Sequence, residues 1–84
     1  MNRERIVKTP ETDPNHHTVG RKFKAWDGKT YFCDSWVENM GYWMSWVDAT
    51  DEDKADPNSR WRKNVSERAI GRTFHEIHDY KATF

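Results

Sequence analysis

VGRKFKAWDGKTYFCDSWVENMGYWMSWVD, residues 19–48, is the stretch of this 84-residue chain that decides its fold. Apolar and polar side chains alternate through much of it, as they do in strands that bury one face. Asp27 and Gly28 are typical of a hairpin turn, because this pair readily takes the positive φ that such turns need. A second turn is expected at residues 39–41, Asn-Met-Gly, because Gly41 suits a left-handed conformation. The stretch therefore predicts an antiparallel meander of three strands.

The composition favours the same fold class. The chain has no leucine, the usual core residue of helices, and it has five Trp, three Tyr and four Phe, which favour strands. Its length corresponds to one small domain. Cys33 is the single cysteine, so no internal disulfide can form. Because no signal-peptide pattern or membrane-spanning apolar run is present, we expect a cytoplasmic protein.

The lengths of the two turns decide which side chains share a face of the sheet. If both turns have three residues, one face holds Phe23, Ala25, Tyr31, Cys33, Val37, Trp43 and Val47. The other face then holds Trp26, Phe32, Trp36, Tyr42, Met44 and Trp46. A two-residue turn at Asp27-Gly28 would instead pair Phe23 with Phe32. Either register leaves large aromatics on both faces, so we expect the sheet to curl into a barrel or to be covered by a partner.

The flanking segments are polar or ambiguous. Residues 1–18 favour a flexible arm, with a short edge strand at residues 5–8 as the alternative. Residues 49–59 indicate a solvated acidic loop, and residues 60–65 a fourth strand. Residues 64–82 fit either a C-terminal helix, which would make the fold α+β, or a tight turn followed by a fifth strand. We favour strand, turn and strand, because Gly71 and the β-branched residues oppose a helix.

The central stretch resembles the opening of Tudor-like and other SH3-like small barrels. The residues that carry the resemblance are Val19, Gly20, Phe23, Ala25, Trp26, Asp27, Gly28, Tyr31 and Cys33. It implies a mainly β fold, a small five-stranded SH3-like antiparallel barrel over residues 19–80, between the flexible arm 1–18 and a tail at 81–84. It also implies binding of peptides, methylated side chains or nucleic acid. In Tudor-like domains an aromatic cage holds a methylated Lys or Arg by cation–π attraction. The candidates for such a cage are Trp26, Tyr31, Tyr42 and Trp43.

Charge is unevenly distributed, although the net charge is zero. Residues 25–59 carry eight acidic and two basic side chains, whereas residues 1–24 and 60–84 each carry six basic and three acidic ones. We therefore expect a protein-binding module or inhibitor that attracts a basic protein or peptide through its acidic loop and anchors it with exposed aromatics. The predicted partner-binding residues are Trp26, Tyr42, Trp43, Asp48, Asp51, Glu52, Asp53 and Asp56. A compact, tryptophan-rich chain of this size with an acidic centre also fits a phage or mobile-element antagonist of a host protein.

The alternative function is nucleic-acid binding. Trp61 alternates with basic side chains, and small barrels bind single strands by stacking bases on aromatics beside basic groups. The predicted residues are Arg60, Trp61, Arg62 and Lys63. The neutral total charge argues against this alternative, because phosphate contacts supply most non-specific affinity.

No pattern indicates catalysis, a metal or a cofactor. His75 and His78 stand three apart around Glu76, whereas the metalloprotease motif needs a four-residue spacing. Cys33 lies in the middle of a predicted strand, where a small buried residue is more common than a nucleophile. We therefore expect a protein that is not an enzyme and that binds no cofactor or metal.

Overall fold

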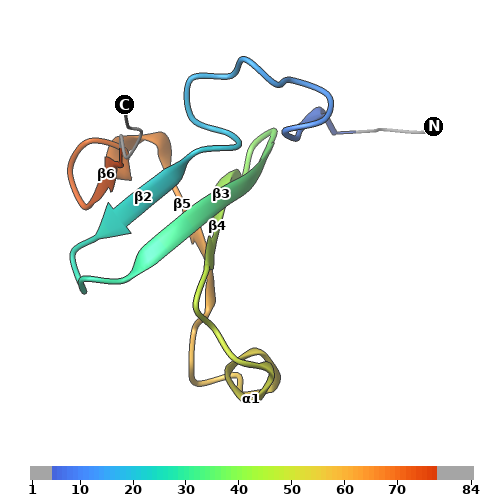
Figure 1. Ribbon diagram of the computed structural model, residues 1–84. Helices are drawn as coiled ribbons and strands as arrows, with labels where there is room; N and C mark the ends of the chain where they lie inside the picture. The colour runs from blue at the N-terminus through green and yellow to red at the C-terminus, as the bar shows by residue number, and fades with distance from the viewer. Residues whose placement is uncertain (1–4, 78–84) are drawn as a thin grey trace, which may run out of the picture.

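A computed structural model describes residues 5–77 (Figure 1). Within these residues six strands form one sheet, and every strand pair in it is antiparallel. In chain order the elements are β1 (Val7–Lys8), β2 (Lys22–Ala25), β3 (Thr30–Val37), β4 (Gly41–Trp46), α1 (Asp51–Ala55), β5 (Arg62–Val65), the 3-10 turn η1 (Glu67–Ala69) and β6 (Phe74–Glu76). The prediction of a mainly β chain is confirmed, and β2, β3 and β4 form the predicted meander.

The order of strands across the sheet is β5-β4-β3-β2-β6, and β1 pairs with the far end of β3. β2 and β1 share one edge of β3, since β2 pairs with residues 30–32 and β1 with residues 36–37. β5 and β6 are the two ends of this order and do not pair with each other, so the sheet is not closed. α1 projects at the end of the molecule opposite the N-terminal segment (Figure 1).

The first hairpin has a three-residue turn, as predicted, but the turn comprises residues 26–28 rather than the predicted 27–29. Phe23 pairs with Tyr31, and the Ala25 N–H donates to the Lys29 carbonyl over 2.9 Å. The alternative pairing of Phe23 with Phe32 is therefore wrong. Opposed residues of an antiparallel pair share a face, so this register places Phe23 and Tyr31 on the buried face together.

The second hairpin contains a β-bulge that the sequence did not predict. Cys33 pairs with Met44, but the next pair is Ser35 with Trp43, so Asp34 has no opposite residue. One extra residue in one strand reverses the faces of everything beyond it. The turn has three residues, as predicted, but they are residues 38–40 rather than 39–41. This shift keeps the predicted faces, so the bulge alone reverses them.

This bulge corrects the predicted faces of β4. Tyr42 and Met44, predicted to lie opposite Phe23, are buried on the same face as Phe23. Trp43, predicted to lie on that face, lies on the other one. The buried core consists of Thr18, Val19, Phe23, Ala25, Tyr31, Cys33, Tyr42, Met44 and Phe74.

The N-terminal segment has the alternative structure rather than the favoured flexible arm. β1 pairs with β3 through Val7 opposite Val37, and the Glu38 N–H donates to the Ile6 carbonyl over 2.9 Å. Val19, at the end of this segment, is only 2% exposed and packs into the core. Residues 5–20 therefore form an ordered strap along one end of the sheet.

The segment after β5 is a tight turn followed by a strand, as favoured. A continuous helix is wrong for residues 64–77, because η1 is a single turn and Phe74 inserts into the core from β6. Gly71 has a φ of 88° and donates its N–H to the Phe74 carbonyl, which closes the turn between η1 and β6. The predicted tail at residues 81–84 lies outside the described residues.

Candidate functional site

A groove of about 530 Å³ lies between the two end strands of the sheet. Its walls come from β5, from the start of β6 and from the turn after β2. It is lined by Trp26, Arg60, Arg62, Lys63, Asn64, Val65, Thr73 and Phe74. Three of these side chains are cationic and none is acidic, so the groove favours an anionic ligand.

The hairpin turn presents Trp26 to solvent. Gly28 takes a φ of 83° and donates its N–H to the Ala25 carbonyl, and Asp27 Oδ1 accepts the Lys29 N–H over 2.9 Å. Trp26 follows the buried Ala25 and is 66% exposed, which is exceptional for so large an apolar side chain. Its ring lies 6.3 Å from that of Phe74, which supports it from the floor of the groove.

Lys63 occupies the space between two aromatic rings. Its Nζ lies 5.7 Å from the centre of the Trp26 ring and 5.0 Å from that of Tyr31, and it donates to the Arg60 carbonyl over 2.7 Å. Burial lowers the pKa of Lys63. The charges of Lys29 and Arg60 lower this pKa further, whereas the charge of Asp27 raises it. Because Lys63 fills the space between the Trp26 and Tyr31 rings, the groove presents a cation and has no open aromatic cage for a cationic ligand.

The two arginines of the groove differ in freedom. Arg62 is held by Asp34, with Nη2 2.8 Å from Oδ1, and its guanidinium lies 4.7 Å from the centre of the Trp43 ring. Within residues 5–77, the Arg60 guanidinium makes no hydrogen bond or ion pair. Arg60 also has a φ of 54°, a left-handed conformation that costs of the order of 1 kcal/mol in a residue other than glycine. Arg60 is therefore the cation best placed to meet a ligand.

The structure brings together three of the four residues predicted for nucleic-acid binding. Arg60, Arg62 and Lys63 line the groove, but Trp61 does not. Trp61 is half-buried beside Lys54, whose Nζ lies 5.3 Å from its ring centre. The exposed aromatic side chain of the groove is instead Trp26, which the sequence placed among the partner-binding residues.

The acidic segment differs from the predicted loop, because it contains α1. Thr50 and Asp53 form a capping box, in which the Asp53 N–H donates to Thr50 Oγ1 and Asp53 Oδ2 accepts the Thr50 N–H. Asp56 Oδ1 accepts the Asn58 N–H over 2.9 Å. Asp53 and Asp56 thus stabilise the segment itself, in addition to any surface role.

Three of the predicted acidic residues have no bonding partner among the residues that the structure describes. Asp48, Asp51 and Glu52 are exposed, and their carboxylates make no hydrogen bond or ion pair within the described part of the chain. They lie at the end of the molecule where α1 projects (Figure 1). This acidic end is therefore open to a cationic partner.

The aromatic cage implied by the resemblance does not form. Tyr42 is 3% exposed and belongs to the core, so it is not available as a surface anchor either. Trp43 lies on the opposite face beneath Arg62, whereas Trp26 and Tyr31 share Lys63. The four residues therefore do not surround one cavity.

Between residues 5 and 77, the structure gives neither a group of metal ligands nor a reactive Cys33 thiol. Cys33 is fully buried, as predicted, and burial, with a smaller effect of Asp34, raises its pKa to about 12, so the thiol stays protonated at neutral pH. No three His, Cys, Asp or Glu side chains in this part of the chain gather as a metal would require. His75 is exposed, and its predicted companion His78 lies outside the described residues.

Comparisons with family models, curated proteins and solved structures find no match to this chain. Among the residues that the structure describes, no helix is long and apolar enough to cross a membrane.

Proposed function

We propose that this protein is a non-enzymatic binding module whose groove takes a single-stranded nucleic acid. The observation that carries the proposal is a highly exposed Trp26 beside Arg60 and Lys63, in a groove that no acidic side chain lines. An aromatic face can stack on an unpaired base, and the flanking cations can meet the phosphates on either side of it. A duplex hides its base faces, so a single strand suits this arrangement better.

We also propose that the domain is SH3-like. Five strands in the order β6-β2-β3-β4-β5, with a 3-10 turn between β5 and β6 in the chain, support this assignment. In this arrangement the open seam between the end strands is where the groove lies. The zero net charge is compatible with the nucleic-acid proposal, because opposite charges lie in different places. The carboxylates of Asp48, Asp51 and Glu52 lie on and beside α1, whereas the cations line the groove.

A labelled oligothymidylate of about ten nucleotides, within the usual site size of a small barrel, tests the proposal by fluorescence anisotropy at low salt. Trp26→Ala should weaken binding by about 5- to 150-fold, since stacking on one aromatic is worth about 1–3 kcal/mol. Trp26→Phe should retain part of the affinity. Arg60→Ala should weaken binding and reduce the slope of log K against log salt by about 0.7.

Lys24→Ala is the matched control, because Lys24 is exposed but lies outside the groove. It should change the affinity little. The proposal is wrong if the wild-type protein does not bind the oligonucleotide at low salt, or if Lys24→Ala weakens binding as much as Arg60→Ala.

The acidic end supports a second candidate function, the binding of a basic protein. Asp48, Asp51 and Glu52 are exposed and unpaired in the described chain, and such charges speed the association of a basic partner. Replacing these three by lysine, with Asp53 kept as the cap, should abolish low-salt capture of basic proteins without changing the fold. Unchanged capture by the reversed protein would leave this end as a solvated surface.

A further inference from the structure

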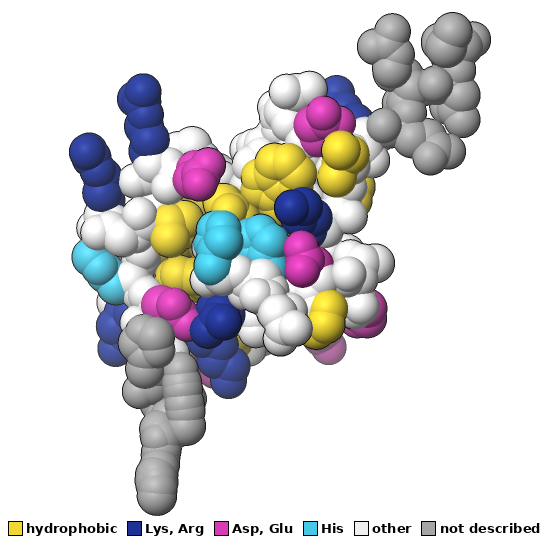
Figure 2. Space-filling model, turned by 90° about the horizontal axis from the view of Figure 1, so that it is seen from above, with side chains coloured by type: hydrophobic (Ala, Val, Ile, Leu, Met, Phe, Trp, Pro, Cys, Tyr) yellow, Lys and Arg dark blue, Asp and Glu magenta, His cyan; other side chains and the backbone are white. Residues whose placement is uncertain are grey.

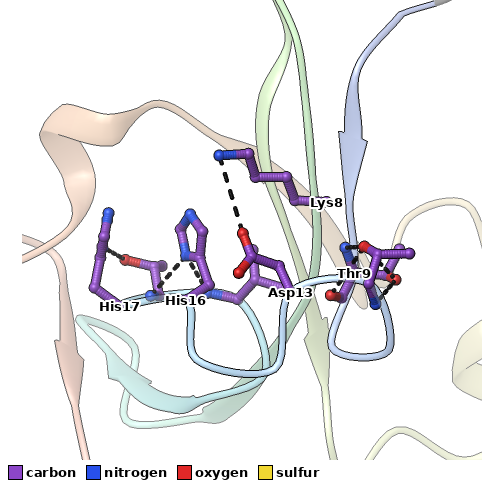
Figure 3. Close-up of polar contacts among 8 residues, drawn as sticks. Lys8, Thr9, Asp13, His16 and His17 are labelled. Carbon is purple, nitrogen blue, oxygen red and sulfur yellow. Dashed lines mark hydrogen bonds and ion pairs between the residues drawn. The ribbon is translucent and has the colours of Figure 1, made fainter.

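His16 holds the strap formed by residues 5–20 in place through its ring. Its Nδ1 accepts two backbone hydrogen bonds, from the Thr18 N–H over 2.9 Å and from the Val19 N–H over 3.0 Å (Figure 3). Thr18 and Val19 are each 2% exposed, so these two N–H groups have little access to water. The ring nitrogen is therefore the acceptor that lets this turn be buried.

These two bonds fix the protonation state of the ring. Nδ1 must carry a lone pair to accept them, so the His16 ring is neutral with its proton on Nε2. A proton on Nδ1 would point an N–H at two other N–H groups and would leave both without an acceptor. The strap as it stands is compatible only with neutral His16.

The groups around His16 also oppose a positive charge. The His17 ring centre lies 4.3 Å away, and the Tyr42 ring of β4 lies 6.1 Å away in a T-shaped arrangement. His17 is itself tied to Thr18, with Nδ1 2.7 Å from Oγ1. Histidine side chains lie near the centre of the face seen in Figure 2, between apolar groups and charges of both signs.

Three further charges face the ring, and they partly cancel. Lys8 of β1 approaches Asp13 to 4.0 Å, and Arg21 Nε donates to the His16 carbonyl over 3.1 Å. The pKa of His16 is lowered from 6.5, chiefly by burial and then by His17, while Asp13 raises it and Lys8 and Arg21 lower it.

We propose that His16 is a pH-sensitive clasp, which holds the strap on the sheet at neutral pH and releases it on acidification. Release would separate β1 from the β3 edge at residues 36–37 and uncover Val19. The direction follows from linkage, because the open strap binds the proton more readily than the closed one. The closed state has its full stability above pH 6.5 and loses it as the pH falls below that value toward the pKa of the closed strap.

Amide hydrogen exchange of the wild-type protein tests the clasp. Protection factors of the Thr18 and Val19 amides should fall by about tenfold for each pH unit below 6.5, until the closed strap itself takes up the proton. Amides of β4, which pairs with β5 and with the other edge of β3, serve as the internal reference, and they should keep their protection over the same range. Unchanged protection at Thr18 and Val19 between pH 7.5 and 5 would overturn the proposal.

Two matched variants separate His16 from its neighbour. His16→Asn supplies an oxygen that can accept the same two N–H groups and does not titrate, so it should keep the strap protected at both pH values. His17→Asn should retain the wild-type pH response. The opposite pattern would assign the effect to His17. If His16→Asn does not fold, the ring nitrogen shifts of wild-type His16 decide, because the clasp requires Nδ1 to be unprotonated at pH 7.5.

Discussion

At Asp34 the β3–β4 pairing carries one residue more on β3 than on β4. The bulged carboxylate is well satisfied, since Oδ1 accepts from Ser35 over 2.8 Å, Oδ2 from Ser45 over 2.6 Å, and both oxygens from Arg62. Burial alone would raise the pKa of Asp34, but these hydrogen bonds, with Arg62 first, outweigh it and lower the pKa from 3.8. A charged, fully bonded residue at this point makes the bulge a built feature of the sheet.

Because of the bulge, we expect Met44 of β4 and Met40 of the preceding turn to contribute very differently to stability. Met44→Ala should destabilise the protein by about 2–5 kcal/mol, because the bulge turns this fully buried side chain into the core. Met40→Ala makes the same change at an exposed position and should cost within about 0.5 kcal/mol. Urea denaturation measures both. Equal costs for the two variants would contradict the bulged register.

At the scale of elements, two segments that the sequence predicted to be a flexible arm and a solvated loop are ordered by short-range polar contacts. In the strap, Thr9 and Thr12 bond to each other's backbone and side chains, and His16 serves the turn that follows. In the acidic segment, Thr50 and Asp53 cap α1. Such contacts leave no apolar period in the sequence, so hydrophobic patterning alone cannot find them.

Deleting residues 1–16 tests the strap as an element. Loss of His16 leaves the buried Thr18 and Val19 N–H groups without an acceptor, at a cost of about 1–3 kcal/mol for each group. For a small domain about 1 kcal/mol lowers the melting midpoint by roughly 4–8 °C. Deleting only residues 1–8 removes β1 but keeps His16, and should cost less. A melting midpoint unchanged by the longer deletion would show that this segment is the flexible arm that the sequence favoured, and not an ordered strap.

At the scale of the whole molecule, cationic and acidic side chains gather in two different places. The cationic groove lies at the seam between β5 and β6, and the free carboxylates lie on and just before α1. The separation explains how a chain of zero net charge can offer a strongly polarised site. It also predicts that ligands of opposite sign would bind at different places.

The sequence predicted the meander, the Asp27-Gly28 turn and the fifth strand, because these depend on local alternation and turn residues. It could not predict the bulge, since nothing local distinguishes Asp34 from an ordinary outward-facing strand residue. The sequence could not predict the groove either, because Trp26 and Arg60 come from segments that meet only when the end strands approach. Trp61 had the right neighbours in sequence but the wrong position in space.

An NMR titration of the full-length protein with oligothymidylate at low salt tests the central claim most directly. We expect the indole N–H signal of Trp26 and the backbone amides of residues 60–64 to shift together and to saturate, while the amides of α1 stay unchanged. Addition of salt should reverse the shifts, because the phosphate contacts involve counterion release. Absence of shifts, or shifts confined to α1 or to the strap, would contradict the assignment of the groove as a nucleic-acid site.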